Sequence, residues 1–143
     1  MTRADAARGL VHAFGHAQEQ VDLSISFPDL PSSDPRFRWA NLAVKHKLLD
    51  TLPDGRFVPD APLAYARLAI GVTHGLGMDE VAANIQGISP GAPYYGGSIV
   101  VFHDLRLKYY ERSYAFKVHV WPEGGYPRGN FAYTLQKLVS LES

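Results

Sequence analysis

The stretch TLPDGRFVPDAP, in the first half of the chain, places two tight turns on either side of one phenylalanine and leads into an apolar run. Asp54 followed by Gly55 suits a turn that needs a positive φ. Pro59 and Pro62 keep the chain extended and direct it into the next segment, because proline fixes φ and restricts the residue before it. We therefore predict that Phe57 is buried between two helices like a peg, with Asp54 and Pro59 as structural residues of the loop.

An internal repeat adds a second constraint. Residues 2–15 match residues 64–77 without a gap, at an offset of 62. The identical pairs are Ala4/Ala66, Ala7/Ala69, Gly9/Gly71, His12/His74 and Gly15/Gly77. Both segments end on glycine, a common helix stop. A helix–loop–helix unit of about sixty residues cannot hide its apolar face alone, so we expect units to pack together, and the chain to begin inside one of them.

The first half is predicted to be helical. Apolar spacing indicates helices over residues 3–16, 35–49, 63–76 and 79–85. Thr2 is a good N-cap for the first of them.

The second half changes its hydrophobic period. Residues 98–107 are rich in strand formers, and residues 110–121 alternate between two faces, as a half-buried strand does. Residues 131–141 read as a third strand, with a closing helix as the alternative. We therefore expect an α+β protein with a helical repeat region at 1–86, a Gly/Pro-rich linker at 87–97 and a small antiparallel β-sheet at 98–143.

Four stretches of the chain together resemble the S-layer homology repeat, a module with which bacterial surface proteins attach to the cell wall. They are Phe27-Pro28-Asp29-Leu30, Trp39-Ala40-Asn41-Leu42-Ala43, the loop TLPDGRFVPD and Thr2-Arg3-Ala4-Asp5. The resemblance covers residues 27–77 as one full repeat and 2–15 as the tail of a preceding one. Residues 124–131, GGYPRGNF, faintly echo the loop, but we expect no suitable helix pair around them.

The resemblance implies a pseudo-threefold bundle whose grooves bind anionic, often pyruvylated, cell-wall polysaccharide. Carried over by motif, Arg3 is the residue that meets the acid, and Asp29, Trp39 and Gly55 are further ligand-binding candidates. A guanidinium fork and an aromatic ring suit an acidic sugar. The alternative is structural: Arg3 at a frayed terminus, Asp29 capping a turn and Trp39 in the core.

The chain also departs from the family pattern. Tyr65 and Arg67 replace the arginine and the acid of the second unit, and Lys47 and Thr51 replace usual glycines. We therefore expect groove binding through the second unit to be weakened or lost.

Composition excludes several classes of function. The formal net charge is zero, which argues against a nucleic-acid partner, and the absence of cysteine excludes disulfides and thiolate metal sites. No apolar run approaches the length of a membrane span, and the N-terminus lacks the features of a signal peptide, so we expect either a cytosolic protein or a piece of something longer.

Motifs for catalysis and metal binding are weak. There is no Gly-x-Ser-x-Gly and no phosphate-binding loop, so we expect no enzyme and no cofactor. His12 and His16 have metal-ligand spacing on one predicted helix, but no third ligand is evident nearby, so no metal site is predicted.

The favoured interpretation is a non-catalytic, extracellular cell-surface module that attaches a larger secreted protein to anionic cell-wall polysaccharide. One alternative is a structural subunit that self-assembles into a surface layer or filament without binding sugar. Another is an accessory C-terminal domain of a secreted hydrolase. Either a homo-oligomer or neighbouring domains could complete the bundle.

Overall fold

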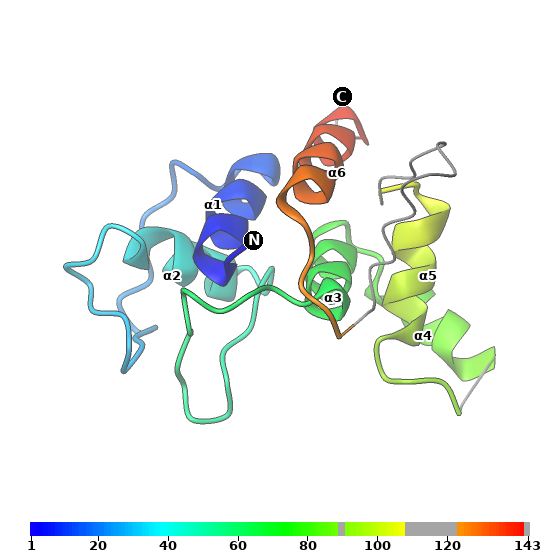
Figure 1. Cartoon of the computed structure of the whole chain (residues 1–143), viewed down its shortest axis with the longest axis horizontal. Helices are drawn as coiled ribbons and strands as arrows, with labels where there is room; N and C mark the ends of the chain where they lie inside the picture. Colours follow the sequence, from blue (N-terminus) through cyan, green and yellow to red (C-terminus); the bar gives the residue numbers. More distant parts are fainter. Residues whose placement is uncertain (89–90, 108–122, 142–143) are drawn as a thin grey trace.

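The computed structural model describes residues 1–88, 91–107 and 123–141. Six helices are found in this part of the chain (Figure 1). They are α1 (Arg3–Ala13), α2 (Phe37–Lys45), α3 (Tyr65–Gly75), α4 (Asp79–Ile88), α5 (Gly96–Asp104) and α6 (Arg128–Leu141).

The expected β-sheet is not found in the part of the chain that the structure describes, so the α+β prediction was wrong. Within the described residues the chain forms only isolated β-bridges, and the regions predicted as the first and third strands are helices α5 and α6. Their buried residues have helical spacing: Val101 lies four positions after Gly97, and Thr134 and Leu138 follow Phe131 by three and seven. Tertiary packing of these faces overrides the β propensity of the valines. The predicted strand at 110–121 lies outside the described residues.

The helices predicted in the first half are present: α1, α2 and α3 are shorter than expected, and α4 runs three residues further. The side chain of Thr2 accepts a hydrogen bond from the Asp5 N–H (3.2 Å), which confirms the N-cap. Helix α2 ends early because Lys47 adopts a positive φ of 57°, and the Leu48 N–H then bonds to the Ala43 carbonyl (2.8 Å). This is a Schellman-type ending, which stops a helix while satisfying its last carbonyls.

The sequence repeat is also a repeat of conformation. Helices α1 and α3 each have 11 residues, and each is followed by a glycine of positive φ, Gly15 at 80° and Gly77 at 71°. The residue after each glycine donates its N–H to a carbonyl of the preceding helix, at equivalent positions in α1 and α3. His16 bonds to the Val11 carbonyl (2.9 Å), and Met78 bonds to the Thr73 carbonyl (3.0 Å).

A third unit is present that the sequence reading missed. Helices α2 and α5 both have nine residues, and Arg106 after α5 has a φ of 56°, like Lys47 after α2. The Leu107 N–H bonds to the Phe102 carbonyl (3.1 Å), as Leu48 bonds after α2. Helix α6 then takes the place that α3 has after α2. The expectation that no helix pair frames residues 124–131 was therefore wrong, because α5 and α6 do so.

The units meet along a shared seam of extended backbone. The Leu63 N–H bonds to the Met1 carbonyl (3.0 Å), and the Tyr126 N–H bonds to the Leu63 carbonyl (2.8 Å). A second matched pair of bonds runs from the first residues of α1 and α3, Arg3 to Ala61 (2.9 Å) and Tyr65 to Gly124 (3.0 Å). The segment entering α3 therefore lies between the segments entering α1 and α6 (Figure 1). We call these hydrogen-bonded segments the seam.

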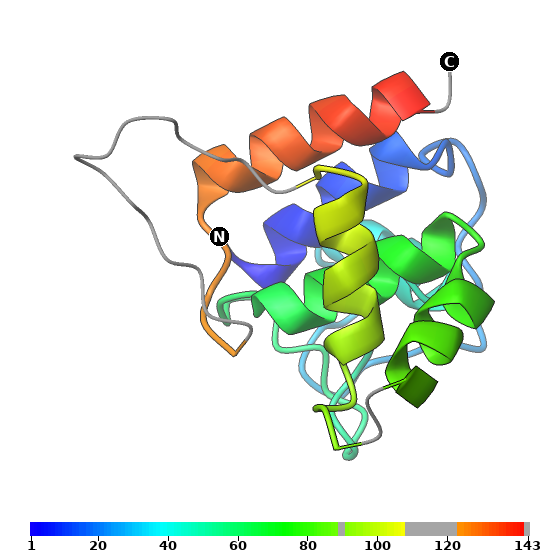
Figure 2. The same ribbon diagram turned by 90° about the vertical axis from the view of Figure 1, so that its right-hand side faces the viewer.

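One hydrophobic core joins the three units. It contains residues of α1, α2 and α3 together with Phe102, Leu107, Tyr126 and Leu138 from the last third of the chain. Helix α5 packs on α3 and α4, and α6 packs on α1, as the turned view in Figure 2 also shows.

Candidate functional site

The Phe57 ring is fully buried, as the sequence predicted. It packs against the Phe27 ring, with centroids 5.4 Å apart, and the Arg3 guanidinium lies over it, 4.9 Å from its centroid. The ring comes from the loop between α2 and α3, so it joins this loop to the start of α1. The loop at residues 50–62 is therefore fixed in place, and it is called the Phe57 loop below.

Arg3 holds the Phe57 loop from one side. Its Nε donates to the Phe57 carbonyl (2.8 Å), and its Nη2 donates to the Asp50 carbonyl. Its Nη1 lies 3.8 Å from the Asp50 carboxylate, and only 11% of the side chain is exposed. Burial lowers the pKa of Arg3, although Asp50 opposes the change. Much of the guanidinium is therefore used inside the protein.

Asp29 holds the same loop from the other side. Its carboxylate accepts hydrogen bonds from the N–H groups of Phe57 (2.9 Å) and Val58 (2.8 Å). The desolvation of Asp29 favours its neutral form, but these two backbone bonds outweigh that cost and lower its pKa. Val58 has a φ of 56°, which is rare for a β-branched residue, and Asp29 stabilises this conformation.

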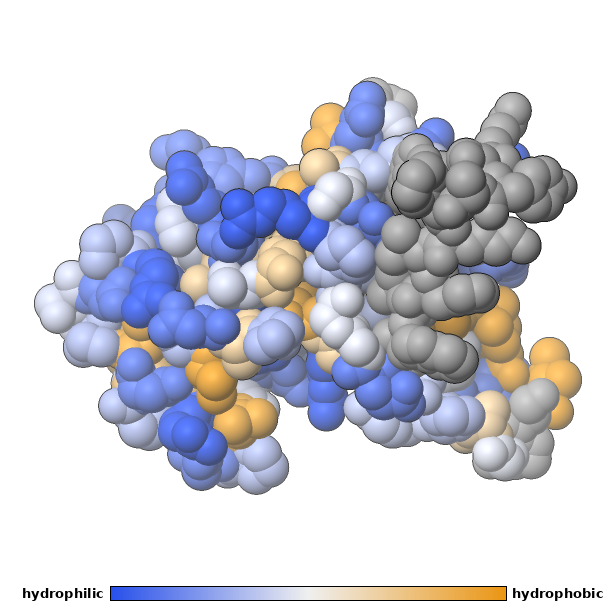
Figure 3. All heavy atoms as spheres, viewed as in Figure 1, coloured by the Kyte–Doolittle hydropathy of each residue, from blue (hydrophilic) through white to orange (hydrophobic). Residues whose placement is uncertain are grey.

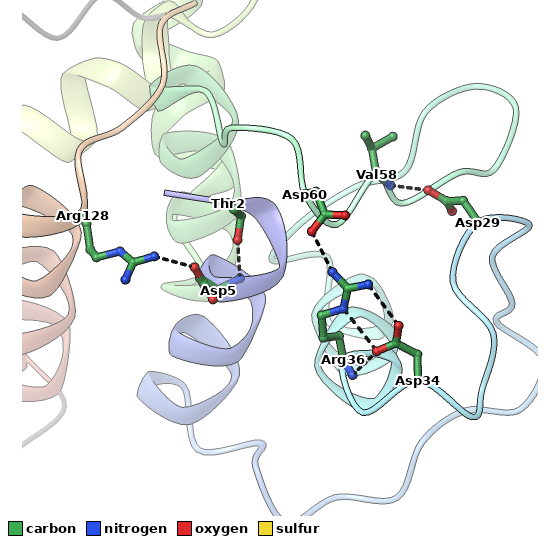
Figure 4. A network of polar contacts seen from close by, with 8 residues as sticks. All are labelled: Thr2, Asp5, Asp29, Asp34, Arg36, Val58, Asp60 and Arg128. Carbon is green, nitrogen blue, oxygen red and sulfur yellow. Dashed lines mark hydrogen bonds and ion pairs between the residues drawn. The ribbon is translucent and has the colours of Figure 1, made fainter.

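Arg36 adds a third attachment, at the far turn of the loop. It pairs with Asp34 (3.0 Å) and with Asp60 (2.8 Å), so it links the start of α2 to the Phe57 loop (Figure 4). The same view shows Arg128 of α6 paired with Asp5 of α1 (2.9 Å). Polar contacts thus connect neighbouring units at several points.

The four ligand-binding candidates do not form one cluster. Arg3 and Asp29 both bind the Phe57 backbone, and Gly55 lies in the same loop, in a turn with a φ of 87°. Asp54 completes this turn by accepting the Arg56 N–H (3.0 Å), and the Pro59 carbonyl accepts the Ala4 N–H (3.0 Å). These residues act together in holding the loop.

Trp39 lies elsewhere, between α1 and α2. Its ring is half-buried and lies 5.0 Å from the His12 ring, with the guanidinium groups of Arg8 and Arg38 5.8 and 5.5 Å from its centroid. It therefore belongs to the packing of these two helices.

An open groove of about 440 Å³ lies beside the Phe57 loop, between the end of α2 and the outer face of α3. Leu48 and Ile70 supply apolar surface to it. Its polar groups are the bases Lys47, Arg67 and His74 and the carboxylates of Asp50 and Asp79. We call this hollow the basic groove. A wall that mixes cationic and apolar groups suits a ligand with an acidic group on a flat, partly apolar body.

Acidic residues orient the bases of the basic groove. Arg67 pairs with the Asp50 carboxylate (3.0 Å), which also faces Arg3, and the His74 Nδ1 lies 2.5 Å from Asp79. The Tyr94 ring lies 5.5 Å from the Arg67 guanidinium. Asp50 therefore connects the buried Arg3 to the open groove.

Sequence reasoning did not assign the basic groove. Arg67 and His74 lie two turns apart on α3, and Lys47 comes from the end of α2, so no recognised motif marks the three bases. Two of them, Lys47 and Arg67, were noticed only as departures from the family pattern. A signal was available, because both departures introduce positive charge.

The surface on the side of α1, α2 and their loops is largely hydrophilic, with apolar residues in small patches (Figure 3). Among the described residues, no helix is both long enough and apolar enough to cross a bilayer.

Comparisons of the chain with protein-family models, with curated proteins and with solved structures gave no match.

Proposed function

We propose that this chain is a non-catalytic binding module of the S-layer homology type, which attaches a protein to an acidic polysaccharide of the cell wall. The observation that supports the proposal most is the threefold repetition of units along the seam, with matched helix endings and matched backbone bonds. Modules built from repeated units commonly bind extended polymers in the surfaces between units.

The basic groove is the proposed sugar site. The Arg67 fork binds a carboxylate of the sugar, because planar guanidinium groups match that geometry. Asp50 preorients Arg67 before the ligand arrives, and Lys47 adds a second positive charge. Ile70 and Leu48 contact the apolar face of a sugar ring.

Arg3 and Asp29 have a positioning role in this proposal. They hold the Phe57 loop from both sides, and Arg3 faces the Asp50 carboxylate that in turn pairs with Arg67. In this proposal Lys47 and Arg67 supply the acid-binding charge in the groove of the second unit, in place of Arg3 at the start of α1.

Co-sedimentation with purified bacterial cell-wall sacculi tests the proposal. The wild-type chain should sediment with intact sacculi and stay in solution once the acidic polysaccharide has been removed. Arg67→Gln should weaken binding by roughly tenfold or more, since a hydrogen bond to a charged group contributes about 1.5–3 kcal/mol.

Arg128→Gln is the matched control, because Arg128 is also an exposed arginine in a single ion pair but lies on α6. It should bind like the wild type. Absence of wild-type binding to sacculi of every type tried, or equal retention on stripped sacculi, would overturn the proposal.

A further inference from the structure

A cluster separate from the basic groove brings two histidines and one glutamate together. His16 follows the Gly15 turn after α1, Glu19 lies in the next turn, and His46 is the C-cap of α2. Backbone bonds hold each position: His16 to Val11 (2.9 Å), Glu19 to His16 (3.1 Å) and His46 to Leu42 (3.1 Å). Three different turns therefore place these side chains.

The side chains of His16, Glu19 and His46 contact one another. The Glu19 carboxylate contacts His16 Nδ1 through one oxygen and His46 Nε2 through the other, the latter at 2.8 Å. The two imidazole rings stack with centroids 3.5 Å apart and planes within 7°. One ligand atom from each of the three residues can be chosen so that all lie within 4.8 Å of one another.

We propose that His16, Glu19 and His46 bind one Zn²⁺ ion. Two imidazole nitrogens and one carboxylate oxygen form a known zinc ligand set, with water in the fourth position of the tetrahedron. The two imidazole rings must first unstack, because nitrogens of stacked, nearly parallel rings cannot both point at one ion. Rotation of the two histidine side chains then brings the ligand atoms to the usual distances of about 2.0–2.2 Å. The ion takes the place of the ring hydrogens that face Glu19, and each neutral imidazole carries its proton on the other ring nitrogen when it binds the ion.

The surroundings allow an ion to enter. The exposed fractions of the His16, Glu19 and His46 side chains are 28%, 34% and 25%, so the cluster is reached from solvent without opening the core.

Two cationic side chains lie near the cluster, and one of them competes with the ion. The Lys45 Nζ lies 3.2 Å from Glu19 Oε1 and must move away, which its flexible stem permits. The Arg38 guanidinium is held by the carbonyls of Ala17 and Glu19, so it does not occupy the ligand positions. The positive charge of the ion then replaces that of Lys45 beside the Glu19 carboxylate.

The other units do not repeat the cluster. At the offset of the sequence repeat, Met78 corresponds to His16, and at the offset between α2 and α5, Leu105 corresponds to His46. The His12–His16 pair considered from sequence is not the ligand pair either, because α1 ends at Ala13 and His12 packs on Trp39. The two ligands missing from the sequence prediction are Glu19, from the turn after α1, and His46, from the end of α2.

Zinc titration of the full chain by calorimetry tests the proposal. The wild type, stripped of metal with EDTA and dialysed, should bind one Zn²⁺ per chain. His46→Gln and Glu19→Gln should each weaken binding by at least about tenfold. His74→Gln is the matched control, because His74 also pairs with a carboxylate, Asp79, but among the described residues this pair belongs to no three-residue cluster of this kind.

A direct measurement covers the case in which a variant fails to fold. Histidine ¹⁵N NMR of the wild type should show zinc-dependent shifts at His16 Nδ1 and His46 Nε2, and not at His74. Circular dichroism should confirm that the variants remain helical. Lack of stoichiometric binding by the wild type, shifts absent from His16 and His46, or an equal loss in His74→Gln would each overturn the proposal.

Discussion

At the scale of single residues, Arg3 and Tyr65 occupy the same position of the repeat and make different contacts. Arg3 in the first unit reaches across to the Phe57 loop with its guanidinium. Tyr65, at the matched position of the second unit, packs against the rings of Phe102 (5.3 Å) and Tyr126 (5.2 Å). The first contact between units is therefore a polar clamp and the second is an aromatic cluster. The change from arginine to tyrosine that weakened the family resemblance preserves packing at the seam.

The clamp makes a prediction about Asp29. Asp29→Asn should lower the free energy of unfolding, because two hydrogen bonds from the Phe57 loop lose their charged acceptor. The loss should be only roughly 1 kcal/mol, because Asp29 is exposed and solvent screens its charge. Urea denaturation at neutral pH measures the difference. Asp60→Asn is the control, and it should change stability by less than about 0.5 kcal/mol, as expected for a surface ion pair.

The stability difference between the wild type and Asp29→Asn should depend on pH. The pKa of Asp29 is lower in the folded protein than in the unfolded chain, so the carboxylate stabilises the fold above its unfolded pKa. This stabilisation is lost as the pH falls through the lowered folded value. The difference between wild type and Asp29→Asn should therefore shrink on acidification below about pH 4. A difference that stays constant down to pH 2 would contradict the assigned role of Asp29.

At the scale of secondary-structure elements, glycines set how closely segments approach. A Cβ added to Gly71 of α3 would lie 1.8 Å from the Leu48 carbonyl oxygen, a backbone atom that cannot move aside alone. Gly9, at the matched position of α1, meets the side chains of Phe131 and Leu135 of α6. The repeated glycine therefore serves two different close approaches.

Gly71→Ala should destabilise the protein by roughly 3 kcal/mol, because the added methyl forces α3 away from the end of α2. Gly129→Ala, within α6, is the control. A Cβ there meets nothing within 4 Å, and alanine is the better helix former by about 1 kcal/mol, so this variant should be as stable as the wild type or more so. Thermal melts followed by circular dichroism compare the two, and similar melting temperatures would refute the close-approach argument.

At the scale of the whole molecule, the seam and the shared core connect the last third of the chain to the first two. The Tyr126 N–H bonds to Leu63, and the buried Tyr126 hydroxyl lies 3.0 Å from Thr134 Oγ1. Phe102 of α5 is fully buried in the same core as Leu10 of α1. These connections predict that the described helices unfold together.

Phe102→Ala tests this cooperativity. It should lower stability by about 3–5 kcal/mol and should do so equally for a probe located far from α5. Trp39 is such a probe, between α1 and α2, in a Trp121→Phe background that leaves it as the single indole. Trp39 fluorescence and helical circular dichroism should give one coincident transition. Separate midpoints would show that the last third folds independently.

The sequence by itself determined the features that rest on local chemistry. Turn residues and prolines around Phe57 predicted a buried ring, Thr2 predicted a cap, and the matched glycines at 15 and 77 predicted two alike helix endings. Each depends on backbone preferences within a few residues, so the local sequence is enough to predict it.

Only the tertiary structure decided the fate of α5, the third unit and the candidate sites. The valines of α5 favour a strand locally, and packing against α3 and α4 makes the segment a helix. The basic groove collects Lys47, Arg67 and His74 where α2 and α3 of one unit pack together. The proposed zinc site collects His16, Glu19 and His46 where the first two units meet. Contacts between distant segments depend on the summed burial of the whole core, and no short stretch of the chain contains that information.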